Sequence, residues 1–248
     1  MNNKAQTIGI IVVVLIAIFL MLVILRFVPK QGNLNVPYNP NAPFEKITYV
    51  ALGASETVGS SATPYPTAGF SYLIRDRLAN YYKNVNYFNF AIGGKPGFYI
   101  YNTEVPKALS KNPDFVTIMT GGNDIISGVS EEEFSNNLDL ILKTLNDNGI
   151  KVFIGTFPDI SNFPRFKQNP DSSVTKDRVI AFNEIITNKA KKYNSIVVDV
   201  YNSRLSTDNS LIALKNPQGK ADGLHPNTQG HILLADLFWN KISKELGL

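Results

Sequence analysis

Short apolar segments alternate with longer segments of helical periodicity from residue 47 to residue 246. The apolar segments have the length of buried strands, and apolar residues recur every three or four positions in the segments between them. This alternation predicts a parallel sheet with helices on both faces and chemistry at the carboxyl ends of the strands. The predicted strands are Ile47–Leu52, Val85–Phe90, Phe115–Met119, Ile150–Ile154 and Ser195–Val200, and the predicted helices are Ala68–Tyr82, Thr103–Ser110, a helix capped by Ser130 that ends at Asn148-Gly149, Thr175–Tyr193 and Asn227–Leu246.

An unbroken apolar segment from Ile8 to Leu25 precedes this pattern. At about 1.5 Å per residue it is about 27 Å long as a helix, close to the ~30 Å core of a bilayer. A cleavable signal peptide is the alternative, but its apolar region is shorter and a small-residue cleavage site follows it. Here Arg26-Phe27-Val28-Pro29-Lys30 follows instead. We therefore expect residues 1–28 to form an uncleaved anchor, with residues 8–28 in the membrane.

Residues 29–46 are rich in proline and asparagine and predict a semi-extended linker, so the folded domain is expected at residues 47–248. The orientation of the domain follows less directly from the sequence. The positive charges of Arg26 and Lys30 slightly favour a cytoplasmic domain, although long domains can cross a membrane despite such a bias. Because N-terminal anchors commonly tether exported proteins, we expect an extracytoplasmic domain.

Composition excludes several kinds of site. The chain has no cysteine and two histidines, which rules out disulfides, thiol nucleophiles and a three-histidine zinc site. Lys4, Arg26 and Lys30 are three of the 24 basic residues, so residues 31–248 hold 21 basic and 20 acidic residues. A nearly neutral domain gives no reason to expect a nucleic-acid partner. The oligomeric state is left open.

Four polar motifs follow predicted strands or precede the last helix. Taken singly, each is as typical of a turn or a helix cap as of a catalytic site. Together they supply what a serine nucleophile needs: a hydroxyl, a base, an acid that orients the base, and donors for an oxyanion. The motifs are Gly53-Ala54-Ser55-Glu56-Thr57, Asn89-Phe90-Ala91-Ile92-Gly93-Gly94, Gly121-Gly122-Asn123-Asp124 and Asp222-Gly223-Leu224-His225-Pro226.

The residues in these motifs suggest a role for each group. Ser55 is the candidate nucleophile, His225 its base, and Asp222 lies three residues from His225, close enough to fix its tautomer. The backbone N–H groups of Ser55 and Gly94 and the side-chain amide of Asn123 are candidate oxyanion donors. The second histidine, His231, is expected to be structural or on the surface, and Asp124 to make local hydrogen bonds.

The ordered set Gly-x-Ser, Gly, Gly-x-Asn-Asp and Asp-x-x-His-Pro resembles the SGNH (GDSL) hydrolase superfamily over residues 47–248. The resemblance implies a flavodoxin-like three-layer α/β/α fold with a five-stranded parallel sheet. It also implies ester or thioester hydrolysis through an acyl-enzyme, without a metal or an organic cofactor. Carried over by position, the implied roles are Ser55 as nucleophile and oxyanion donor, Gly94 and Asn123 as further oxyanion donors with Gly93 as the neighbouring candidate, His225 as base and Asp222 as the orienting acid.

One position departs from the family pattern, because Ala54 stands where an aspartate is common. The departure leaves the catalytic set intact and opens the question of how the loop after the first strand is held. We expect a membrane-anchored esterase that acts on a small ester, a lipid or an acylated glycan. An O-acyltransferase or deacetylase acting on cell-surface glycan or lipid is an alternative, and so is a non-catalytic surface binding module.

Overall fold

The computed structural model describes Val36 and residues 38–248, which belong to the second of two units in the chain, residues 33–248. The anchor expected at residues 8–28 and the first part of the expected linker lie outside the described residues. Within the described part of the chain, no helix is both long enough and apolar enough to cross a bilayer. The first strand begins at Phe44, three positions before the expected domain start, so the end of the expected linker belongs to the sheet.

The sheet has five parallel strands in the order β2-β1-β3-β4-β5. This confirms the predicted five-stranded parallel sheet of a three-layer α/β fold. The register places Gly53 of β1 beside Met119 of β3, so the carboxyl ends of these two strands lie side by side. The strands are β1 (Phe44–Gly53), β2 (Tyr82–Asn89), β3 (Phe115–Met119), β4 (Lys151–Gly155) and β5 (Ile196–Val198).

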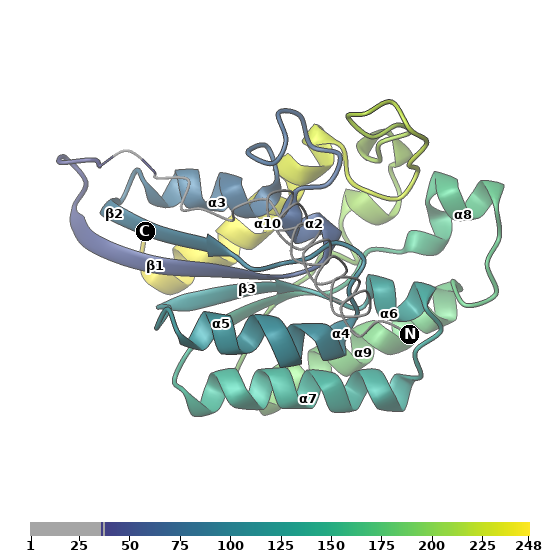
Figure 1. Cartoon of the computed structure of the whole chain (residues 1–248), viewed down its shortest axis with the longest axis horizontal. Coiled ribbons are helices and arrows are strands. Elements are labelled where there is room, and N and C mark those ends of the chain that lie inside the picture. The colour runs from purple at the N-terminus through teal and green to yellow at the C-terminus, as the bar shows by residue number, and fades with distance from the viewer. Residues whose placement is uncertain (1–35, 37) are drawn as a thin grey trace, which may run out of the picture. The chain divides into compact units, whose positions relative to one another are not determined.

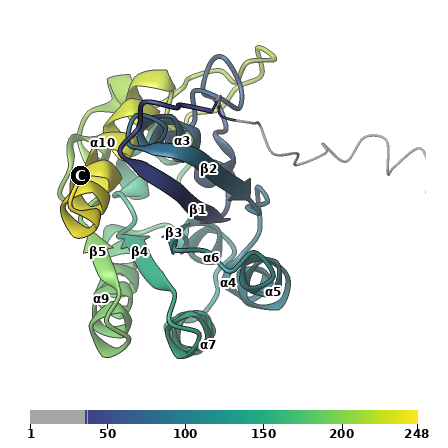
Figure 2. The same cartoon turned by 90° about the vertical axis from the view of Figure 1, so that its left-hand side faces the viewer.

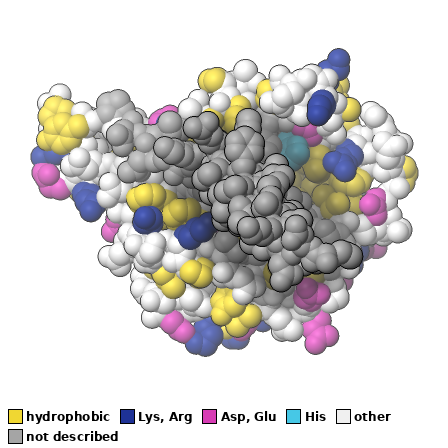
Figure 3. All heavy atoms as spheres, viewed as in Figure 1, with side chains coloured by type: hydrophobic (Ala, Val, Ile, Leu, Met, Phe, Trp, Pro, Cys, Tyr) yellow, Lys and Arg dark blue, Asp and Glu magenta, His cyan; other side chains and the backbone are white. Residues whose placement is uncertain are grey.

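Helices cover both faces of the sheet (Figures 1 and 2). On one face lie α3 (Phe70–Leu78) and α10 (Thr228–Leu246), and on the other lie α5 (Val105–Leu109), α7 (Glu131–Asp147) and α9 (Lys176–Lys192). Every residue of β3 is buried between these layers, which is why four of its five residues are apolar. Figure 3 shows acidic and basic side chains interspersed over the face in view, as the nearly equal charge count leads one to expect.

Short helices occupy the connections after the strands. They are α2 (Ser55–Val58), α4 (Gly97–Tyr99), α6 (Gly122–Ile126) and α8 (Pro164–Gln168), and a π-helical turn, Ile100–Glu104, joins α4 to α5. Periodicity cannot reveal helices this short, because they contain barely one turn. The first, second and third of the four polar motifs fall at the starts of these connections, after β1, β2 and β3.

Most predicted elements are present with shifted ends. Ser130 caps α7, and its hydroxyl accepts a hydrogen bond from the Glu133 N–H at 3.1 Å. The predicted helix Ala68–Tyr82 is too long, because the helix ends at Leu78 and Tyr82 begins β2. The phenol ring of Tyr82 packs 5.2 Å from the ring of Phe44, its partner across the sheet, so pairing with β1 determines its conformation.

Candidate active site

Ser55 lies directly after the sharp turn that ends β1. Gly53 makes this turn with φ +137°, and a Cβ at this position would lie 2.2 Å from the carbonyl oxygen of Met119. Only glycine fits a backbone that approaches β3 so closely. Ser55 is the first residue of α2, so its N–H has no acceptor within the helix. The residue is 8% exposed, and its hydroxyl makes no hydrogen bond to any residue that the structure describes.

A buried carboxyl group, that of Glu104, holds the loops that follow β1 and β2. Its Oε2 accepts a hydrogen bond from the Gly53 N–H at 2.9 Å, and the Ile92 N–H, which donates to the Gly53 carbonyl at 3.3 Å, also acts on the pKa of this carboxyl. Its Oε1 has no hydrogen-bond partner in the described part of the chain. Burial raises the pKa of Glu104 to about 8, against which the two backbone donors act. Glu104 therefore supports the nucleophile loop, which Ala54 leaves without an aspartate.

The loop after β2 brings two glycines to the nucleophile. A Cβ on Gly93 would lie 3.7 Å from the Cβ of Ser55, so this backbone passes directly beside the serine. Gly94 has φ +77°, and a Cβ there would meet no atom within 4 Å. The space in front of Gly94 is thus open, as the approach of a substrate carbonyl requires.

Asn123 and Asp124, in the motif after β3, make hydrogen bonds to the loop that follows β2. Both carboxylate oxygens of Asp124 accept from the Gly97 N–H, at 3.0 and 3.1 Å, so Asp124 is a hydrogen-bonding residue as expected, but its partner lies 27 positions away and is not local. The Asn123 amide donates one hydrogen bond, 3.2 Å long, to the carbonyl oxygen of Lys95. Since a side-chain amide has two N–H donors, one remains for a ligand. Asn123 therefore lies beside the glycine loop, where the sequence analysis expects it.

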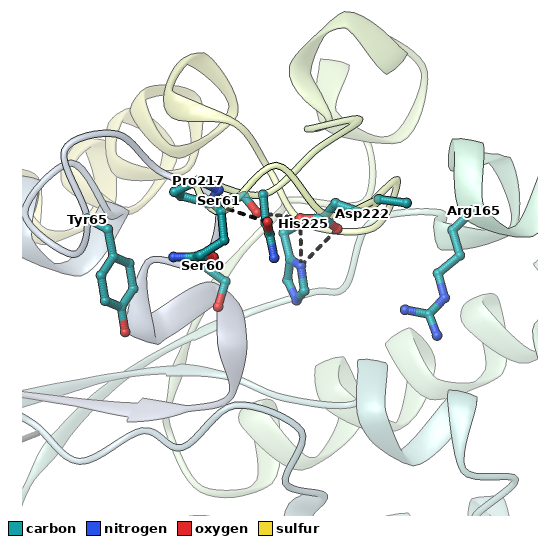
Figure 4. Close-up of a pocket in the computed structure, with 10 residues that line it drawn as sticks. Ser60, Ser61, Tyr65, Arg165, Pro217, Asp222 and His225 are labelled. Atoms are coloured by element: carbon teal, nitrogen blue, oxygen red, sulfur yellow. Dashed lines mark hydrogen bonds and ion pairs between the residues drawn. The ribbon is translucent and has the colours of Figure 1, made fainter. Parts of the chain in front are cut away.

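Asp222 and His225 form a direct pair (Figure 4). The Nδ1 of His225 lies 3.0 and 3.1 Å from the two carboxylate oxygens of Asp222. Asp222 Oδ1 also accepts from the backbone N–H groups of Leu224 and His225, at 3.0 and 3.1 Å, and Oδ2 accepts from the Ser61 hydroxyl. The aspartate side chain is 4% exposed and the imidazole 22%. The Asp222 carboxylate therefore contacts Nδ1 of the imidazole, while Nε2 has no hydrogen-bond partner in the described part of the chain.

The surroundings of this pair set its protonation. Burial raises the pKa of Asp222, but the hydrogen bonds from His225 and Ser61 outweigh it, and the pKa falls well below its usual range. Burial lowers the pKa of His225, and the Asp222 carboxylate and the charge of Glu56 outweigh it, so this pKa is raised above its ordinary value of 6.5. A raised pKa makes the imidazole a better proton acceptor once it is neutral.

The pair is held by a small antiparallel excursion of the chain, residues 211–227. Backbone hydrogen bonds join Ala213 to both Gly223 and His225, at 2.7 and 2.9 Å, and Leu214 to Asp222 at 3.0 Å. Further out, Asn216 and Lys220 close the tip with a bond of 2.8 Å. Asp222 and His225 are therefore fixed by backbone hydrogen bonds, and residues 215–221 form the tip of this segment.

The structure thus brings the expected residues to one end of the sheet in two groups. Ser55 lies against Gly93, and Asp222 lies against His225, while no hydrogen bond joins Ser55 to His225 among the described residues. The Ser60 N–H donates to the Ser55 carbonyl at 3.0 Å, and the next residue, Ser61, donates to Asp222, so one short segment contacts both groups.

His231 has a structural role, as expected. It is completely buried, its Nε2 donates to the carbonyl oxygen of Ser60 at 2.9 Å, and its Nδ1 accepts from the Phe70 N–H at 3.4 Å. Burial lowers its pKa to about 4, so the ring is neutral at pH 7. His231 thereby holds the segment that carries Ser61. Sequence analysis missed Ser61 and Glu104, because nothing next to them in the sequence marks their contacts.

The three-layer α/β fold with a five-stranded parallel sheet and the Asp222–His225 pair define the class of protein to compare. The sequence model of the GDSL-like Lipase/Acylhydrolase family matches residues 51–233, which include Ser55 and His225. The chain belongs to this family, which confirms the resemblance drawn from the motifs and makes the protein a hydrolase that acts on esters. A comparison with curated proteins found no match.

Solved structures of similar fold come from this class of enzyme. The lipase/acylhydrolase from Enterococcus faecalis is 22% identical with a TM-score of 0.63, over 80% of this chain and 96% of that one. Axe2, an acetylxylan esterase from Geobacillus stearothermophilus, is 20% identical with a TM-score of 0.62, over 79% and 94%. The acetyl xylan esterase AlAXEase is 21% identical with a TM-score of 0.60, over 79% and 100%. At these identities the likeness concerns the fold.

Proposed function

We propose that the protein cleaves carboxylic esters through an acyl-enzyme at Ser55. His225 Nε2 takes the hydroxyl proton as Ser55 Oγ attacks the ester carbonyl carbon. The proton then passes to the leaving alcohol as the carbon–oxygen bond breaks. In the second half, His225 takes a proton from water, the resulting hydroxide attacks the acyl carbon, and the proton returns to Ser55 as the acid leaves. Every bond that forms is matched by one that breaks.

In the proposed site, three donors receive the negative charge that develops on the carbonyl oxygen. The Ser55 N–H is free of intrahelical bonds, the Gly94 N–H lies in a loop braced by Asp124, and the Asn123 amide has one donor to spare. Removal of one such donor in other enzymes costs about 10²–10³ in rate. Gly93, which touches the serine, is the alternative to Gly94 in this role.

The observation that carries the proposal is the contact of 3.0 Å between His225 and Asp222, at the end of the sheet where Ser55 stands. The test is hydrolysis of p-nitrophenyl acetate by Ser55→Ala. The control is Ser172→Ala, which changes an exposed serine between α8 and α9. We expect Ser55→Ala to lose essentially all activity and Ser172→Ala to keep it. Full activity in Ser55→Ala would end the assignment.

Three other functions are distinguished by further measurements on the same protein. An O-acyltransferase would pass the acyl group to an added acceptor alcohol on a glycan or lipid, and product analysis with such an alcohol detects it. A deacetylase of surface glycans would prefer acetyl esters in a series of chain lengths. A non-catalytic binding module would fail to react with a fluorophosphonate probe at Ser55 while remaining folded.

We also propose that the enzyme is tethered to a membrane by residues 8–28 and acts on the extracytoplasmic side. The support is the unbroken apolar sequence of Ile8–Leu25 within that segment. Fractionation should recover the full chain with membranes, whereas a chain that starts at Pro43 should remain in the supernatant. Protease added to intact cells should digest the domain; protection of the domain would place it in the cytoplasm.

A further inference from the structure

A polar cavity of about 380 Å³ opens beside His225 (Figure 4). Half of the residues that line it have hydroxyl or amide side chains, and Asp222 and His225 also line it. Ser55, the glycine loop and Asn123 do not line it. The hydroxyl and amide residues of the wall are Ser60, Ser61, Tyr65, Asn216 and Gln218.

The position of the cavity tells which part of an ester it holds. His225 gives its proton to the leaving alcohol, so the alcohol must lie on the side of the imidazole. The oxyanion donors and Ser55 surround the acyl carbon on the other side. A cavity that includes His225 and excludes the oxyanion donors therefore receives the alcohol portion of the ester.

Arg165 is the one lining residue with a permanent positive charge. Its backbone is fixed to the segment between Asp222 and His225, because the Arg165 N–H donates to the Gly223 carbonyl at 3.0 Å. A Cβ on Gly223 would lie 2.8 Å from that nitrogen, so the two backbones are in close contact. In Figure 4 the guanidinium lies across His225 from Tyr65. Any ligand in the cavity is therefore within the field of this charge.

The guanidinium has no carboxylate partner among the described residues. Asp222 accepts from four donors and its side chain is 4% exposed, and Asp171, whose pKa is lowered by hydrogen bonds from Ser173 and by the charge of Arg165, makes no ion pair with it. The charge of Arg165 also acts to lower the pKa of His225, which opposes the transfer of a proton to the base. In the free enzyme, Arg165 therefore makes His225 less basic. An anionic group on the substrate would neutralise the charge of Arg165 and remove this effect.

We propose that Arg165 binds a carboxylate or phosphate group on the alcohol portion of the substrate. The inference rests on the proposed ester hydrolysis at Ser55 and narrows its substrates to esters of anionic alcohols. The planar guanidinium matches the two oxygens of either anion, and the hydroxyl and amide groups of the cavity wall suit the polar remainder of such an alcohol.

The test compares three acetate esters of similar shape: 3-acetoxybenzoate, 3-acetoxyphenyl phosphate and the neutral 3-acetoxybenzamide. Wild-type kcat/KM should be about 10- to 100-fold higher for an anionic ester than for the amide, as one charged hydrogen-bonded contact allows. Arg165→Gln should bring this ratio close to one, and Arg165→Lys should keep part of it. Lys167→Gln changes an exposed cation on the same helix outside the cavity and should leave the ratio as it is. The two anionic esters distinguish carboxylate from phosphate.

Calorimetric binding of 3-hydroxybenzoate, 3-hydroxyphenyl phosphate and 3-hydroxybenzamide provides a readout that does not require turnover. Selective binding of an anion by the wild type, lost in Arg165→Gln, supports the site even if no ester is cleaved, in which case the proposed hydrolysis alone fails. Equal binding of all three compounds, or a selectivity that survives Arg165→Gln, overturns the proposal. Thermal unfolding of each variant establishes that it is folded.

Discussion

The Ser61 hydroxyl donates a hydrogen bond to Asp222 Oδ2, whereas the backbone N–H groups of the turn at Asp222 donate to Oδ1, so both carboxylate oxygens are held. Ser61 adopts a left-handed conformation with φ +65°, which is uncommon for a residue other than glycine, and it is almost fully buried. With two backbone N–H groups and the imidazole, this hydroxyl gives the carboxylate four donors. The acid is therefore oriented before any substrate arrives.

The first prediction compares the two members of this contact. Asp222→Asn should lower kcat by about 10³–10⁴ with little change in KM, because the amide no longer fixes the tautomer of His225. Ser61→Ala should lower kcat by about tenfold, since three donors remain on the carboxylate. Steady-state kinetics with p-nitrophenyl acetate measures both. Equal losses in the two variants would contradict this order of importance.

The second prediction concerns pH. Because the pKa of His225 is raised and the base must be neutral, kcat/KM should increase with pH and reach half its maximum above pH 6.5. Glu56→Gln should move this midpoint to lower pH, since the charge of Glu56 favours the imidazolium. Glu132→Gln, an exposed change at the start of α7, should leave the profile in place. A wild-type midpoint below pH 6.5 would speak against His225 in this environment.

The third prediction concerns the buried carboxyl of Glu104. Its folded-state pKa of about 8 exceeds the ordinary 4.5, so its contribution to stability is fully present below pH 4.5 and is lost as the pH rises through 8. Relative to Glu104→Gln, the wild type should lose about 2–4 kcal/mol of unfolding free energy between pH 5 and pH 9. Denaturant unfolding at the two pH values measures this difference. Parallel pH dependence in the two proteins would contradict it.

Glu104 also allows the support of the loops to be tested. Glu104→Gln keeps an oxygen that can accept from the Gly53 N–H, so it should keep most of kcat, whereas Glu104→Leu should lower kcat more than tenfold with KM little changed. Failure of Glu104→Gln to restore kcat in a folded protein would show that the carboxyl does not act by holding the loop.

The fourth prediction concerns His231. Its pKa of about 4 lies below the ordinary 6.5, so its contribution to stability is present above pH 6.5 and is lost as the pH falls through 4. His231→Leu should cost roughly 1–3 kcal/mol at pH 7, because the Ser60 carbonyl and the Phe70 N–H lose their partner. It should also be less sensitive to pH between 6.5 and 4. Unfolding curves at pH 7, 5.5 and 4.5 measure both effects.

The sequence predicts those parts of the fold and site that depend on near neighbours. The bounds of β3 are correct because five buried residues stand between polar ones, and the pairing of Asp222 with His225 follows from a spacing of three. The predicted helix end at Tyr82 is wrong, because Tyr82 pairs with Phe44 in the sheet and α3 ends at Leu78. Ser61 and Glu104 contact residues 161 and 51 positions away, and no local pattern encodes such contacts.

The backbone hydrogen bonds within residues 211–227 hold Asp222 and His225 apart from the residues at the tip that line the cavity. The acid and the base stand on the hydrogen-bonded part of this segment, while Asn216 and Gln218, which face the cavity, stand on its tip. Under the proposed function, substitutions at Asn216 and Gln218 should change which alcohol fits the cavity while the backbone bonds that hold Asp222 and His225 are kept. We therefore expect residues 216–220 to be the part of this segment whose sequence can vary with substrate preference.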